Sequence, residues 1–84
     1  MVKINSTLRQ KAIGEIAAFM AQRHGLAEHD REFGERVLER VLGDANRGLK
    51  EFDPVTGGKL ALSAFQRAGV SEATAALLIA ELSG

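Results

Sequence analysis

The sequence predicts an all-α protein, a small bundle of about four helices that forms a single domain over residues 1–84. Two observations support this prediction. Apolar residues recur at helical spacing along most of the chain, and the segments they form are separated by glycine, by proline or by residues that cap helices. The last segment, residues 73–82, is apolar at every position except Thr74 and Glu81. The length of 84 residues suits one domain.

The first helix is expected over residues 6–24. Asn5, Ser6 or Thr7 could each cap its start, because a short polar side chain can accept from the free backbone N–H groups of the first turn. Gly25 suits the left-handed conformation that ends many helices. The apolar stripe of this helix consists of Leu8, Ala12, Ile13, Ile16, Ala17 and Met20.

The second helix is expected over residues 30–49, with its start near His29 or Asp30. Gly43 and Gly48 interrupt it, and each glycine costs about 1 kcal/mol in a helix interior. We therefore expect this helix to fray or bend after Leu42, or to stop by Leu49. Its apolar stripe consists of Phe33, Val37, Leu38, Val41, Leu42, Ala45 and Leu49.

A loop is expected over residues 53–58, because Asp53-Pro54 and Gly57-Gly58 are strong turn signals. A short third helix follows at 62–68 and ends at Gly69. The fourth helix is expected over 72–82, with Ser71 as its cap. Val70 precedes this cap, at the position from which an apolar side chain usually packs back onto the helix.

Composition limits the possible functions. There are no cysteines, so the chain has neither disulfides nor thiolate zinc sites to supplement its core, and small proteins with thin cores often gain stability by oligomerising. The 11 basic and 11 acidic residues give a net charge of zero, which does not favour a polyanionic partner. No apolar run approaches the ~20 residues that cross a bilayer. We expect a cytoplasmic protein with no membrane partner.

The side chains that could perform chemistry form no recognisable catalytic motif. Two histidines and two carboxylates, at His24, Glu28, His29 and Asp30, could hold a transition metal, but no metal-ligand spacing joins them. The serines lie at predicted helix ends, where serine is a cap. The sequence therefore predicts a protein that is not an enzyme, with no catalytic residue, cofactor, metal or small-molecule substrate.

The stretch from Phe52 to Phe65 resembles an EF-hand loop in outline. It has an opening acid at Asp53, a glycine at the sixth loop position and an aliphatic residue at the eighth. Oxygen ligands are missing, however, because Val55, Gly57 and Ala64 occupy the third, fifth and twelfth positions. This resemblance implies, as one alternative, a degenerate EF-hand-like module that pairs helices without calcium.

A second alternative is a DNA-associated helix-turn-helix regulator, because Gly69-Val70-Ser71 joins two short apolar helices. A recognition helix needs side chains that donate to base edges, whereas residues 68–84 contain no lysine or arginine. We therefore expect no nucleic-acid partner.

The favoured prediction is a protein–protein interaction module that acts as an adaptor, regulator or inhibitor. A helix that is apolar around nearly its whole circumference has to be covered, and two amphipathic helices with one short helix cannot cover all of it. We expect the chain to form a homodimer, or to bind another protein, through the last helix. The candidate interaction residues are Ala73, Ala76, Leu77, Leu78, Ile79, Ala80 and Leu82.

Overall fold

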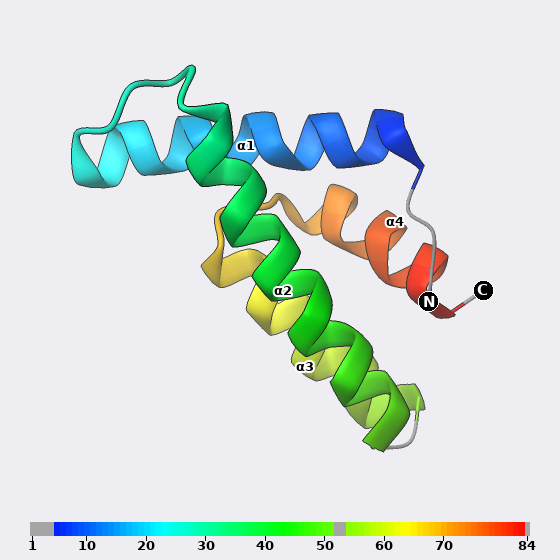
Figure 1. The fold of residues 1–84 in the computed structure, drawn as a ribbon. Helices are drawn as coiled ribbons and strands as arrows, with labels where there is room; N and C mark the ends of the chain where they lie inside the picture. Colours follow the sequence, from blue (N-terminus) through cyan, green and yellow to red (C-terminus); the bar gives the residue numbers. More distant parts are fainter. Residues whose placement is uncertain (1–4, 52–53, 84) are drawn as a thin grey trace.

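A computed structural model describes residues 5–51 and 54–83 of the chain. Four helices follow one another, α1 (Ser6–His24), α2 (Arg31–Glu51), α3 (Pro54–Arg67) and α4 (Glu72–Ser83), and no strand occurs in the described residues. In Figure 1, α2 and α3 run side by side as a long hairpin, whereas α4 lies alongside α1 at one end of that hairpin. The all-α, four-helix prediction is confirmed.

Helix α1 begins and ends as its sequence predicts. The Asn5 side chain accepts a hydrogen bond of 2.8 Å from the Thr7 backbone N–H, so Asn5 is the cap among the three candidates. Gly25 takes the left-handed conformation with φ +69° and ends the helix. Arg23 and His24 occupy the last turn, where the helix dipole favours cations.

Helix α2 starts after Asp30, whose carboxylate accepts a hydrogen bond of 3.2 Å from the Phe33 backbone N–H. The helix then continues through Gly43 and Gly48 to Glu51, two residues beyond the expected end. Its contact with α3 is the most extensive between any two helices. Tertiary packing of this kind outweighs the local cost of two glycines, because most helix stability in proteins comes from packing.

The expected loop at 53–58 is wrong for every residue in it that the structure describes. Helix α3 already begins at Pro54, so it is twice as long as the segment expected at 62–68. Proline is well tolerated in the first turn of a helix, where the missing N–H has no partner in any case. Asp53 lies outside the described residues. Because Pro54–Arg67 is one continuous helix, the EF-hand-like outline does not form a loop.

The core lies where all four helices meet. Ile13 and Ile16 of α1, Leu38 of α2, Phe65 of α3 and Leu78 of α4 are fully buried. Burial of a side chain of this size contributes about 1.5–3 kcal/mol. The core therefore holds one side of α4 against α1 and α3.

Helices α1 and α2 approach closely at Gly34, which is buried. A Cβ atom at this position would lie 3.2 Å from the Ile13 carbonyl oxygen. The absence of a side chain at Gly34 thus lets the α2 backbone lie against the α1 backbone.

Candidate interaction surface

Helix α4 has two apolar sides that differ in exposure. Thr74, Ala75, Leu78 and Leu82 are buried against the other helices. The side chains of a second set are exposed, and their spacing of three, four and seven residues places them on one face of the helix. We call this set the outer stripe: Ala73, Ala76, Leu77 and Ala80.

The seven predicted interaction residues are therefore divided between core and surface. Leu78 and Leu82 belong to the core, and Ile79 is half-buried against it. The four residues of the outer stripe face solvent, and Leu77, the largest of them, is 51% exposed. The chain covers one side of α4 by itself and leaves the other side open.

A polar contact between α1 and α4 fixes the start of α4. Glu15 of α1 accepts hydrogen bonds from the Ser71 backbone N–H at 3.4 Å and from the Thr74 hydroxyl at 3.3 Å. The Ser71 hydroxyl accepts from the Thr74 backbone N–H at 3.3 Å, so the predicted cap is confirmed. A carboxylate at a helix N-terminus is stabilised by the helix dipole.

Among residues 72–82 of α4, Thr74 is the one polar residue that is buried, and its side chain is fully buried. Its hydroxyl also accepts a hydrogen bond of 3.1 Å from the Ser71 hydroxyl. A buried hydroxyl has to keep its partners, so rotation of α4 would break this contact. The contact with Glu15 helps to decide which side of α4 faces outward. Sequence reasoning missed Glu15 because its partners are more than fifty residues away.

The turn between α3 and α4 lies directly on Phe19 of α1. Gly69 has φ +92°, and a Cβ atom here would lie 2.4 Å from the Phe19 Cγ atom. The following Val70 is buried, as its position before the cap predicts. The direction in which α4 leaves α3 is therefore set by close packing as well as by hydrogen bonds.

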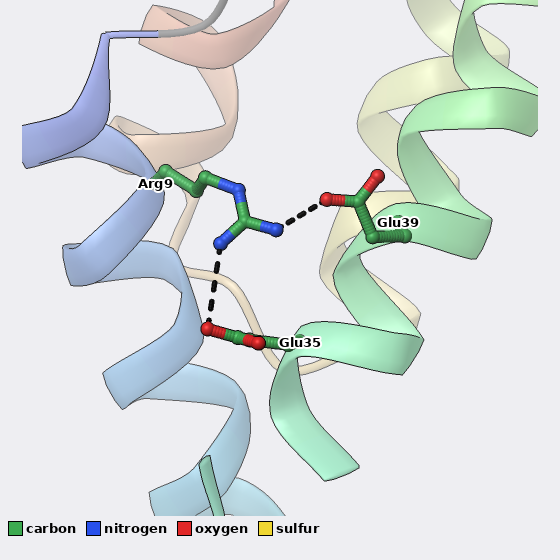
Figure 2. A network of polar contacts seen from close by, with 3 residues as sticks. All are labelled: Arg9, Glu35 and Glu39. Atoms are coloured by element: carbon green, nitrogen blue, oxygen red, sulfur yellow. Dashed lines mark hydrogen bonds and ion pairs between the residues drawn. The ribbon is translucent and has the colours of Figure 1, made fainter. Parts of the chain in front are cut away.

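Figure 2 shows an ion-pair network on the outside of α1 and α2. Arg9 of α1 contacts Glu35 of α2 at 3.6 Å and forms a second ion pair with Glu39, one turn further along α2. Both glutamates are substantially exposed. Exposed ion pairs of this kind contribute about 0–1 kcal/mol each to stability. We interpret this network as a structural link between α1 and α2.

The candidate metal cluster does not come together. His24, Glu28 and His29 are exposed, and Asp30 caps α2. Among the residues that the structure describes, no three side chains of the types that hold metals form a group. Within residues 5–51 and 54–83, none of the four helices combines the length and the apolar character needed to cross a bilayer.

The fold and the surface define a small four-helix protein with an exposed apolar stripe on its last helix. Compared with known proteins, the chain matches no family model, no curated protein and no solved structure.

Proposed function

We propose that this protein is a small non-enzymatic interaction module that forms a homodimer through the outer stripe of α4. The observation that supports this proposal is Leu77, a large apolar side chain that is half exposed in the middle of three exposed alanines. An apolar patch of this kind is typical of interaction surfaces. The small alanines beside it would let a partner helix approach to about 8 Å, the near limit for packed helices.

The size of the outer stripe indicates a weak association. Burial of the exposed half of Leu77 would contribute about 1 kcal/mol, and each alanine less. Weak and transient protein contacts bury less than about 1,200 Å² in total, and a stripe of four residues belongs to this class. We expect a weak dimer that forms only at high micromolar protein concentration and dissociates on dilution.

The residue that tests this proposal is Leu77, because its substitution can separate association from folding. Leu78 is fully buried, so Leu78→Glu would unfold the protein and report on the core alone. Leu77→Glu places the charge in the outer stripe instead. Ser63→Glu on α3, also at an exposed position, is the matched control.

The measurement is light scattering after size exclusion at high micromolar protein concentration. We expect an average mass above 9.0 kDa that rises toward twice this value with protein concentration for the wild type and for Ser63→Glu, and 9.0 kDa at every concentration for Leu77→Glu with unchanged helicity. A wild-type protein that stays monomeric at this concentration would refute self-association. The cytoplasmic location and the role as adaptor, regulator or inhibitor stay predictions from the sequence.

A further inference from the structure

The fold has a second surface, a groove away from α4, that the outer stripe could occupy. Its apolar lining comes from α1, α2, α3 and the residue after α3, and consists of Met20, Val37, Val41, Ala64 and Ala68. None of these residues belongs to α4, so the groove and the outer stripe are separate surfaces of one chain. We call it the α2–α3 groove.

The charged residues of the two surfaces are complementary. Arg40 and Arg67 line the α2–α3 groove together with Asp44, which gives the lining a net positive charge. The outer stripe is flanked by Glu72 and Glu81, which are exposed, and residues 68–84 contain no lysine or arginine. Opposite potentials of this kind favour the pairing of one surface with the other.

The two surfaces also agree in length. The outer stripe extends from residue 73 to residue 80, and the α2 side of the groove extends from residue 37 to residue 44. Both segments span seven helical steps, or about 10 Å at 1.5 Å per residue. An α4 helix laid along the groove would thus place its alanines and Leu77 over the apolar lining.

Direct packing of α4 against the α4 of a second copy is less favourable. That arrangement would bring Glu72 and Glu81 of both copies to one interface, with no cation from either segment to neutralise them. Like charges at an interface oppose association. The groove removes this difficulty because it supplies arginines.

We infer that the outer stripe of α4 docks into the α2–α3 groove of a second copy of this chain. The inference rests on the proposed function of the outer stripe and names its binding partner. Each copy carries one stripe and one groove, so two copies related by a two-fold axis can make the same contact twice. A contact that fails to close in this way would instead extend into a ring or filament.

Charge reversal in the groove provides the first test. The groove variant carries Arg40→Glu and Arg67→Glu, both at exposed positions. The matched control carries Lys11→Glu and Lys59→Glu, which reverse the same number of charges at exposed positions outside the groove. We expect the groove variant to raise the dissociation constant of self-association roughly tenfold relative to the control, measured by sedimentation equilibrium.

Mixing of complementary variants provides the second test. The stripe variant carries Glu72→Lys and Glu81→Lys and, like the groove variant, should associate poorly alone. In an equimolar mixture, the lysines of one copy meet the new glutamates in the groove of the other, and the reverse contact remains as in the wild type. We therefore expect the mixture to associate about as tightly as the wild type, with circular dichroism confirming that each variant is folded.

The outcomes separate this inference from the proposed function. In one outcome, Leu77→Glu dissociates the dimer whereas the groove variant associates as tightly as its control. This result would show that the outer stripe is an interface but that the groove is not its partner. Failure of the mixture to regain association would also overturn the inference. A wild type that never self-associates would overturn both.

Discussion

Glu15 and Thr74 are joined by a side-chain hydrogen bond of 3.3 Å although 59 residues separate them in the sequence. The same carboxylate accepts from the backbone N–H of Ser71, immediately before α4. One side chain of α1 thereby holds the first turn of α4. The exposure of the outer stripe depends on this orientation.

We predict that Glu15→Ala lowers the free energy of unfolding by about 1–3 kcal/mol, because the buried Thr74 hydroxyl loses an acceptor. Glu15→Gln should cost less, since the amide oxygen can still accept. Urea denaturation measures both. In a Thr74→Val background the Glu15→Ala effect should shrink, and equal losses in both backgrounds would show that the two side chains are not coupled.

The contact between Gly69 and Phe19 gives a second prediction. Gly69→Ala introduces a Cβ atom into the Phe19 ring and also strains a left-handed residue. Gly25→Ala is the control, because Gly25 also has a positive φ but open space around it. We expect Gly25→Ala to cost about 1–2 kcal/mol and Gly69→Ala about 1–3 kcal/mol more. Equal melting temperatures for the two variants would disprove close packing of the turn on Phe19.

The glycines of α2 give a third prediction from a single helix. Gly43 has open space around it, so Gly43→Ala should raise stability by about 0.5–1 kcal/mol through the better helix propensity of alanine. Gly34→Ala has the same local gain but presses on the Ile13 backbone. We expect Gly34→Ala to be less stable than Gly43→Ala in thermal unfolding, and the opposite order would contradict the close approach of α1 and α2.

The DNA-associated alternative has a simple test. The exposed side of α4 is apolar with acidic neighbours, and a phosphate backbone repels carboxylates. We predict no gel shift with mixed-sequence duplex at about 50 mM salt, where nonspecific electrostatic binding is strong. A shift that weakens steeply as salt is added would support the alternative and count against an interaction module.

The sequence was sufficient where the signal is local. Caps at Asn5 and Ser71 and stops at Gly25 and Gly69 act within a few residues, so the helix ends they set could be predicted. The start of α3 could not, because Pro54 is compatible with both a loop and the first turn of a helix. Packing along α2 decides between these two conformations.

The candidate site shows the same division. The run of apolar residues in α4 predicts a helix with more apolar side chains than a small core can cover. It could not distinguish Leu77 from Leu78, because a helix that is apolar on every side has no periodic pattern to mark its inner face. The contact between Glu15 and Thr74 was hidden for a related reason, since nothing near Glu15 in the sequence indicates a contact with α4.

The sequence by itself therefore determined that this protein is helical and where most of its helices end. The tertiary structure alone decided that Leu78 is core and Leu77 is surface, and that α1 supplies the carboxylate that holds α4. The physical reason is the distance along the sequence over which each feature is determined. Backbone conformation and capping depend on neighbouring residues, whereas the rotation of a helix about its axis depends on contacts between segments that only folding brings together.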